Sequence, residues 1–265
     1  MIEERKQKEI ELQSKIRSKE IRKNALDYSR FTSNMKFYSI TQKSTDFFNN
    51  YLLKEFKGKK VLDYGCGDGN TAVFSAKNGA EVVGIDISSV RIKNSKELAV
   101  KEGVSDRTSF FVMDAEKTEF PDNYFDGIIC TGVLHHLEIE SALKEMARIL
   151  KPEGSIICNE PLVHNPIFQL YRRLTPHLRS GWEMEHILSK KEIKLAEKYF
   201  GKIELRFFYL TTLLAVPFRN SPFFNFILSI FEKIDSIILK IPGLRWWAWQ
   251  IIFVLSQPKN DEGKK

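Results

Sequence analysis

The feature that most constrains the fold is a regular alternation of short apolar runs with helical stretches between residues 59 and 160. The apolar runs predict strands, and the stretches between them place apolar residues at helical spacing. Predicted strands are 59–65, 80–88, 108–115, 125–132 and 154–160, and predicted helices are 71–78, 90–102 and 139–150, with a helix stop and turn at 151–154. Nearly continuous apolar strands separated by helices predict a parallel sheet covered by helices on both faces.

The flanking regions predict further helices and two more strands. Before residue 58 we expect a charged helix over the first thirty residues and a second helix over 41–56. After residue 160 we expect an irregular cap over 161–189, a helix at 190–199, a strand at 202–210, an apolar helix at 223–240 and a last strand at 247–258. A chain of 265 residues has room for one sizeable domain with such additions.

Cysteine content and hydropathy indicate the compartment. Cys66, Cys130 and Cys158 are an odd number of cysteines, which argues against a disulfide framework and for a reducing environment. The opening residues are too charged for a signal peptide, and no 18 uncharged apolar residues run together. We therefore expect a cytoplasmic protein, with peripheral contact at the inner face of a membrane as one extension of that expectation.

The net charge of +7 is unevenly distributed. Residues 31–160 carry 16 Lys and Arg against 19 Asp and Glu, whereas residues 161–265 carry 16 against nine, together with 17 of the 32 aromatic residues. A basic, aromatic-rich C-terminal part suggests contact with nucleic acid or a membrane surface, and composition does not choose between them.

The strongest motif is the glycine-rich turn that follows the first predicted strand. Glycines at 65, 67 and 69 let a ligand approach the backbone, and the following helix offers free N–H donors. Asp86 ends the next strand, where a carboxylate can accept from two ribose hydroxyls, so the pattern predicts a nucleoside-containing cofactor. A dinucleotide is disfavoured because Asn70 replaces the third glycine of its fingerprint, and Asp63 suits a cationic amino-acid group instead.

These segments resemble the class I S-adenosylmethionine-dependent methyltransferases of the small-molecule type. The resemblance is carried by Asp63-Gly65-Gly67-Gly69, by Asp86, by the pair Asp114-Ala115, by the loop Thr131 to His136, and by the run EMARILKPEGSII. It covers residues 58–160 in detail and the flanking parts in outline. It implies an α/β, Rossmann-like, seven-stranded, mostly parallel sheet with helices on both faces, an antiparallel last strand, and a helical cap and insert.

The resemblance also implies a domain plan and a set of residues that bind S-adenosyl-L-methionine. The plan is an N-terminal helical cap (1–57), a cofactor-binding core (58–160), and a C-terminal half (161–265) with an acceptor cap (161–189) and a hydrophobic helical insert (about 211–245). Methionine-binding residues would be Asp63, Gly65, Cys66, Gly67 and Thr131; Asp86 would bind the ribose; Ile87, Asp114 and Ala115 would contact the adenine. No cluster of Cys and His suggests a metal site.

Candidate acid–base residues lie where loops leave the C-terminal ends of the predicted strands. They are His135 and His136 after the fourth strand, Glu160 after the fifth, and His164 and His186 in the cap. A general base would assist a phenol, enol or carboxylic acid acceptor, although proximity alone could suffice for methyl transfer. The alternative interpretation makes the His135-His136 pair structural and the cap histidines merely solvated. Cys130 and Met113 are predicted to lie in the core.

The acceptor is predicted to be a small or lipid-like, hydrophobic molecule, as in quinone, polyketide, lipid or glycan-related biosynthesis. The loop after the fourth strand lacks the Asn/Asp-Pro-Pro-aromatic sequence of enzymes that methylate base amines, so nucleic acid is disfavoured. The apolar helix 223–240 and the sequence Arg245-Trp246-Trp247-Ala248-Trp249 predict contact of 221–249 with a membrane or a greasy acceptor. The open alternatives are a helix packed on the sheet or on a dimer partner, an RNA-directed methyltransferase, and a non-catalytic module acting at a membrane surface.

Overall fold

The structure is a computed structural model that describes residues 4–7, 10–11, 35–174 and 186–259. The chain divides into two compact units, which we describe separately. Unit 1 consists of Met1–Phe47, Pro161–Ser189 and Phe207–Ile251, and unit 2 of Phe48–Glu160, Lys190–Arg206 and Ile252–Lys265. The predicted N-terminal cap, acceptor cap and insert thus fall mainly in unit 1, while the predicted cofactor-binding core falls in unit 2.

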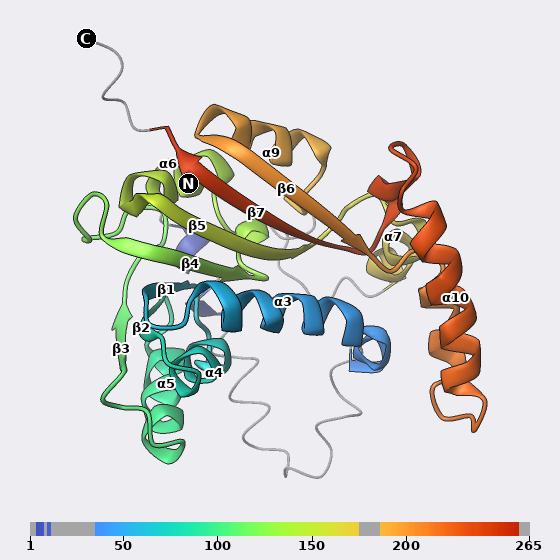
Figure 1. Cartoon of the computed structure of the whole chain (residues 1–265), viewed down its shortest axis with the longest axis horizontal. Helices are drawn as coiled ribbons and strands as arrows, with labels where there is room; N and C mark the ends of the chain where they lie inside the picture. Colours follow the sequence, from blue (N-terminus) through green and yellow to red (C-terminus); the bar gives the residue numbers. More distant parts are fainter. Residues whose placement is uncertain (1–3, 8–9, 12–34, 175–185, 260–265) are drawn as a thin grey trace. The chain divides into compact units, whose positions relative to one another are not determined.

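The described residues include a seven-stranded sheet with the order β3-β2-β1-β4-β5-β7-β6 (Figure 1). Its strands are β1 (Lys60–Tyr64), β2 (Glu81–Asp86), β3 (Thr108–Val112), β4 (Phe125–Thr131), β5 (Leu150–Pro161), β6 (Phe200–Phe208) and β7 (Gln250–Pro258). β1 pairs in parallel with β2 and β4, β2 with β3, and β4 with β5. The arrow of β7 points against those of β5 and β6 in Figure 1. The predicted fold class is therefore confirmed.

Burial along the sheet follows the position of each strand. In the centre, β1 and β4 are almost entirely buried. β3 is an edge strand, and Phe111 and Val112 on it are 46% and 56% exposed. Cys130 in β4 is fully buried, as predicted, but Met113 lies just beyond the end of β3 and is only half-buried. The prediction of a core position for Met113 was wrong because an edge strand has no neighbour to cover it.

The helices of unit 2 form where periodicity predicted them. They are α4 (Asn70–Lys77), α5 (Ser89–Lys101), α6 (Ile139–Ile149) and α9 (Lys190–Leu195). The 3₁₀ helix η5 (Ala196–Lys198) directly follows α9. The helix α3 (Gln42–Glu55) begins in unit 1 and ends in unit 2. Ser88 caps α5 by accepting from the amide of Arg91, and Glu138 caps α6 by accepting from the amide of Ser141. The helix stop predicted at 151–154 is confirmed, because α6 ends at Ile149. The turn is wrong, because these residues belong to β5, in an irregular stretch between the pairs Phe125–Leu150 and Gly127–Ser155.

Unit 1 has its own aromatic core. Its described elements are η2 (Met35–Ile40), the start of α3, α7 (Pro166–Leu174), η6 (Thr212–Phe218), α10 (Phe224–Ile238) and η7 (Leu244–Trp247). The core cluster contains Phe37, Ile40, Phe168, Tyr209, Leu213, Val216 and Trp249. The rings of Phe168 and Trp249 stack with centroids 4.5 Å apart. Most of the charged helix predicted over the first thirty residues lies outside the described residues, and 4–7 and 10–11 are helical.

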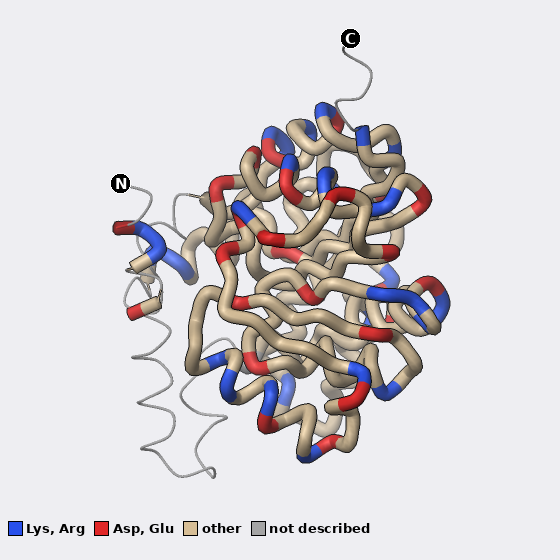
Figure 2. The backbone as a smooth tube through the Cα atoms, turned by 90° about the vertical axis from the view of Figure 1, so that its left-hand side faces the viewer, with Lys and Arg blue, Asp and Glu red and all other residues tan. Residues whose placement is uncertain are grey.

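Charge and hydropathy give two further observations. Lys and Arg are interspersed with Asp and Glu over the side of the molecule that Figure 2 presents. Across the described ranges, every helix is either too short or too polar to cross a membrane.

Candidate functional site

The glycine-rich turn between β1 and α4 forms the floor of the candidate site. Gly65 and Gly67 have φ values of +74° and +54°, a backbone region that favours glycine. A Cβ atom added to Gly65 would lie 2.3 Å from Cγ2 of Val133. Gly65 is therefore required both by its backbone conformation and by the side chain that lies over it.

Asp63, the last residue but one of β1, carries a buried carboxylate. Its side chain is 2% exposed, and its Oδ2 has no hydrogen-bond partner among the described residues. Burial raises the pKa of Asp63 to about 7, a backbone hydrogen bond with Ala72 lowers it, and the negative charge of Asp86 raises it. Because an unsatisfied buried carboxylate is costly, this atom fits a ligand that carries a positive charge. The amino group of S-adenosylmethionine is such a ligand group.

Asp86, at the end of β2, joins the glycine turn to the start of α5. Its Oδ2 accepts from the amide of Gly67 at 3.0 Å, and its Oδ1 accepts from the amide of Ser88 at 2.8 Å. A carboxylate offers about four acceptor sites, so these bonds are compatible with binding two ribose hydroxyls. The half-buried Ile87 follows directly. Asp86 thus lies where the sequence predicted it, and it also fixes the backbone at Gly67 and Ser88.

The loop after β3 brings Asp114 and Ala115 to the same edge of the sheet. The amide of Met113 donates to the carbonyl of Asp86 at 3.1 Å, and the amide of Glu116 donates to Oδ1 of Asp114 at 2.9 Å. The hydroxyl of Tyr64 donates to the carbonyl of Ala115. These contacts connect the loop to β1 and β2, which carry the other two predicted acids.

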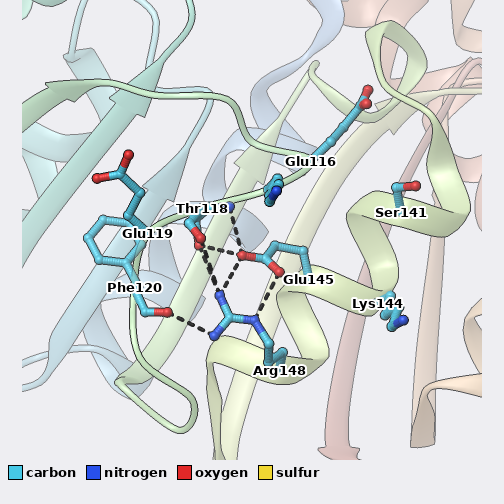
Figure 3. A pocket seen from close by; sticks show the side chains of 9 residues that line it. Glu116, Thr118, Glu119, Phe120, Ser141, Lys144, Glu145 and Arg148 are labelled. Carbon is cyan, nitrogen blue, oxygen red and sulfur yellow. Dashed lines mark hydrogen bonds and ion pairs between the residues drawn. The ribbon is translucent and has the colours of Figure 1, made fainter. Parts of the chain in front are cut away.

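A partly buried ion pair between Glu145 and Arg148 of α6 holds the far end of this loop (Figure 3). Oε1 of Glu145 accepts from the amide of Thr118 at 2.8 Å and from its hydroxyl at 2.5 Å. Arg148 donates to Glu145 at 2.7 Å, to the carbonyl of Phe120 at 2.8 Å and to Asp122 at 2.6 Å. An open groove of about 510 Å³ lies over this network. The groove is therefore lined by side chains that brace the loop.

Glu160 occupies a different position from the one predicted. It lies inside β5 rather than in a loop after it, and it is fully buried. Its Oε1 accepts from the amides of Val133 and Leu134, both at 2.8 Å, and its Oε2 lies 2.7 Å from Nδ1 of His135. Glu160 thus holds the loop after β4. It binds the backbone amide of Val133, the residue whose side chain lies over Gly65. These contacts position the loop, and a catalytic role of Glu160 stays a prediction.

The other predicted catalytic residues are distributed over both units. His135 is 8% exposed, and its ring centroid lies 4.2 Å from that of the half-buried His136. Thr131 is exposed at the end of β4. His164 is exposed and belongs, with the half-buried His186, to unit 1. Unit 2 therefore brings together His135, His136 and Glu160, whose catalytic roles stay predictions.

Two predictions about the site concern Cys66 and metal ligands. Burial raises the pKa of the Cys66 thiol, so this side chain is a neutral packing group in the turn. Within the described ranges, no three His, Cys, Asp or Glu side chains gather in a way that could hold a metal ion.

Sequence reasoning missed four residues that shape the site. Tyr64 looks like an ordinary strand residue, and Val133 like an ordinary loop residue, so neither gave a signal. Glu145 and Arg148 did give one, because an acid and a base three residues apart on a helix face each other.

The comparisons with known proteins agree with this geometry. Residues 62–158 match the family described as a methyltransferase domain. The chain is 34% identical to the sterol 24-C-methyltransferase of Aspergillus fumigatus over 130 residues, which are 48% of this chain and 34% of that protein. It is 37% identical to phosphoethanolamine N-methyltransferase 3 of Arabidopsis thaliana over 120 residues, 43% and 24% of the two chains. The chain thus spans about a third or less of the length of these curated relatives.

Solved structures share the fold at low identity. A protein from Pyrococcus horikoshii superimposes with a TM-score of 0.57 at 22% identity, covering 88% of this chain and 95% of that one. The geranyl diphosphate C-methyltransferase of Streptomyces coelicolor gives 0.57 at 14% identity, covering 89% of both chains. These solved structures show that the fold is shared. The segment 62–158 of this chain is similar to the methyltransferase domain family, and it contains the acids that surround the glycine turn.

Proposed function

We propose that this protein transfers a methyl group from S-adenosyl-L-methionine to a small-molecule or lipid-like acceptor. The observation that carries the proposal is the buried Asp63 carboxylate, whose Oδ2 lacks a partner among the described residues. It lies in the strand that enters the glycine turn, and Asp86 holds that turn from the next strand. A ligand that combines a cation with a nucleoside matches both groups.

The residues of unit 2 divide the binding task. Asp63 and the backbone from Gly65 to Gly67 would hold the amino-acid part, and Asp86 would hold the ribose. Asp114 and Ala115 would contact the adenine, while Tyr64 keeps their loop in place. The bound cofactor supplies an activated methyl group on a sulfonium, so the protein's own contribution is alignment of the acceptor and exclusion of water.

The loop from Thr131 to His136 is the part of unit 2 best suited to face an acceptor. Glu160 fixes the amides of Val133 and Leu134 and the ring of His135, so the loop enters the reaction in one conformation. We propose His136 as the general base where the acceptor must lose a proton, since His135 is already engaged by Glu160. A base at this point would add about 10²–10⁴-fold to the rate.

The names of the relatives support an organic acceptor of low molecular weight. They include methyltransferases of sterols, of 27-O-demethylrifamycin SV and of tocopherol, and a structural neighbour acts on geranyl diphosphate. Several of these molecules are hydrophobic. A neighbour of similar fold is a [4+2]-cyclase, so the fold by itself does not establish methyl transfer.

Cofactor binding is the first test. Calorimetry with S-adenosylhomocysteine should show binding to the full chain and at least about tenfold weaker binding to Asp86→Ala, which loses the ribose contact and the Gly67 bond. Asp106→Ala, a substitution of an exposed aspartate in the loop before β3, is the matched control and should bind normally. Absence of heat from the unmodified chain would refute the proposal.

Transfer is the second test. The protein, methyl-labelled cofactor and either a lipid extract or a soluble-metabolite extract are incubated together. Label in the lipid fraction supports a lipid-like acceptor, and label in the soluble fraction a polar one. Cofactor binding without label in either fraction would favour a non-catalytic module.

A further inference from the structure

The helix α10 of unit 1 buries its acid and exposes its apolar residues. Asp235 is 5% exposed and is the buried residue of this helix. By contrast, Phe226 and Ile237 are 68% and 67% exposed. Helices of water-soluble domains show the opposite arrangement, so the orientation of α10 needs an explanation.

The explanation on the inner side of α10 is a polar anchor. The carboxylate of Asp235 accepts from the amides of Leu210, Thr211 and Thr212 at 3.0, 2.7 and 3.2 Å, and from both threonine hydroxyls. These amides precede or begin η6, so Asp235 satisfies donors that have no partner within that short helix. Phe224 and Leu228 pack on the core cluster of unit 1 from the same side.

The opposite side of α10 exposes apolar residues, and further exposed apolar residues follow the end of the helix; together we call them the outer stripe. They are Phe223, Phe226, Ile230, Ile237, Ile241, Leu244 and Trp247, and the exposed Lys233 lies between Ile230 and Ile237. Their exposed fractions range from 38% to 68%. Seven large exposed apolar residues within the segment 223–247 favour an interaction surface over scattered surface residues.

Most of the exposed charges in the segment that carries the outer stripe are positive. Residues 207–251 contain four basic residues, Arg219, Lys233, Lys240 and Arg245, and two acids. Asp235 is buried, and Glu232 lies 3.1 Å from Nζ of Lys43 with its side chain 19% exposed. Arg219, Lys233 and Lys240 are exposed. The face that carries the outer stripe therefore presents positive charge, while its acids are turned inward or neutralised.

This combination fits one partner best. Apolar residues flanked by lysines, with a tryptophan at one end, are typical of helices that lie in a membrane interface. A second copy of the chain fits less well, because a two-fold interface between outer stripes would bring Lys233 and Lys240 close to the same cations of the partner. An anionic surface instead complements them.

We propose that the outer stripe and its flanking cations bind the surface of a bilayer that contains anionic lipid, with α10 lying in the plane of the interface. The proposal goes beyond methyl transfer and does not depend on it, because binding to vesicles and binding of cofactor are separate measurements. It gives the basic, aromatic C-terminal part of the sequence a defined partner.

Vesicle flotation with the full chain tests the proposal. The protein should float with vesicles of phosphatidylglycerol and phosphatidylcholine, and at least about tenfold less with phosphatidylcholine alone or in high salt. Phe226→Gln combined with Ile237→Gln should reduce the partition coefficient about tenfold or more. Lys233→Gln combined with Lys240→Gln should reduce it about fivefold for each lysine.

Matched controls separate the stripe from general stickiness. Val100→Gln with Phe111→Gln removes exposed apolar residues from unit 2, and Lys96→Gln with Lys101→Gln removes exposed lysines from α5. Both control pairs should bind vesicles normally. Circular dichroism and calorimetry with S-adenosylhomocysteine verify that every variant is folded.

Two outcomes would overturn the proposal. One is equal flotation of the stripe variant and the unmodified chain. The other is absence of vesicle binding together with a concentration-dependent dimer, in analytical ultracentrifugation, that Phe226→Gln with Ile237→Gln dissociates; the outer stripe would then be a contact between copies.

Discussion

Oε2 of Glu160 lies 2.7 Å from Nδ1 of His135, and the other oxygen of the same carboxylate holds two consecutive backbone amides of the β4 loop. One buried side chain therefore satisfies three groups that lie 25 to 27 positions earlier in the chain, just after the neighbouring strand β4. A carboxylate in this position fixes the backbone of the loop that we propose faces the cofactor.

Glu160→Gln should destabilise the protein and weaken cofactor binding. The substitution removes the charge that the two amides and His135 share, and leaves at least one buried group poorly satisfied, at a cost of about 1–3 kcal/mol. Urea unfolding gives the stability and calorimetry the affinity. Glu153→Gln, in the same strand but exposed, is the control and should change neither. If Glu160→Gln retained full stability and lost only turnover, Glu160 would instead be a catalytic residue.

Cofactor binding should depend on pH through Asp63. Burial raises the pKa of this carboxyl to about 7 in the ligand-free protein, and the cationic amino group of the ligand prefers the ionised form. The affinity for S-adenosylhomocysteine should therefore weaken as the pH falls below about 7, by up to tenfold per pH unit. Calorimetry between pH 5.5 and 7.5 measures this slope. A flat profile in the unmodified chain would contradict the assignment of Asp63.

Asp63→Asn should have opposite effects on binding and on stability. The folded-state pKa of Asp63 lies above the unfolded value of 3.8, so the folded state binds the extra proton, and this group costs stability as the pH rises from about 4 to about 7. The ligand-free variant should consequently be more stable than the unmodified chain at pH 8, by on the order of 1 kcal/mol or more. Its affinity for cofactor should fall, and the pH dependence should disappear. Thermal unfolding at pH 5 and pH 8 checks the sign.

Gly65→Ala should lower the free energy of unfolding more than Gly103→Ala, although both glycines have almost the same backbone conformation. Their φ values are +74° and +70°, so the conformational penalty of alanine is similar, about 1 kcal/mol. A Cβ at Gly65 meets Val133 at 2.3 Å, whereas nothing lies within 4 Å of one at Gly103. The additional loss at Gly65 should be about 1–3 kcal/mol, with loss of cofactor binding. Val133→Ala combined with Gly65→Ala should restore part of the stability and part of the cofactor binding. If it restores neither, the clash with Val133 is not the reason for the effect of Gly65→Ala.

Arg148→Ala should loosen the loop that carries Asp114. Burial acts to raise the pKa of Glu145, but hydrogen bonds from Arg148 and Thr118 outweigh this effect, and the pKa is lowered. The ion pair therefore stabilises the fold above about pH 4.5, and this contribution is lost at lower pH. Removing Arg148 should cost about 1–3 kcal/mol at pH 7 and weaken cofactor binding. Arg107→Ala breaks an exposed pair with Asp106 and should cost under about 1 kcal/mol. Equal effects of the two substitutions in urea unfolding would argue against a bracing role.

Local sequence was sufficient for the elements of unit 2. The strands β1, β2 and β4 and the helices α4, α5 and α6 form where hydrophobic spacing predicted them. Asp63 and Asp86 lie in the last two residues of β1 and β2, and Asp114 follows β3. Such features depend on residues only a few positions apart, so they can be read before the fold is known. The apolar character of α10 was predicted for the same reason.

The roles of Glu160, Asp235 and residues 151–154 were decided by the tertiary structure. β5 runs through the predicted turn in an irregular stretch between two pairs with β4, and pairing of its later residues with β4 places the Glu160 carboxylate against amides that are distant in sequence. In unit 1, the amides before η6 turn Asp235 inward and leave Phe226 and Ile237 exposed, the reverse of what side-chain polarity alone predicts. A charged side chain goes where its hydrogen bonds are satisfied, and only the folded chain determines which distant backbone groups can satisfy them.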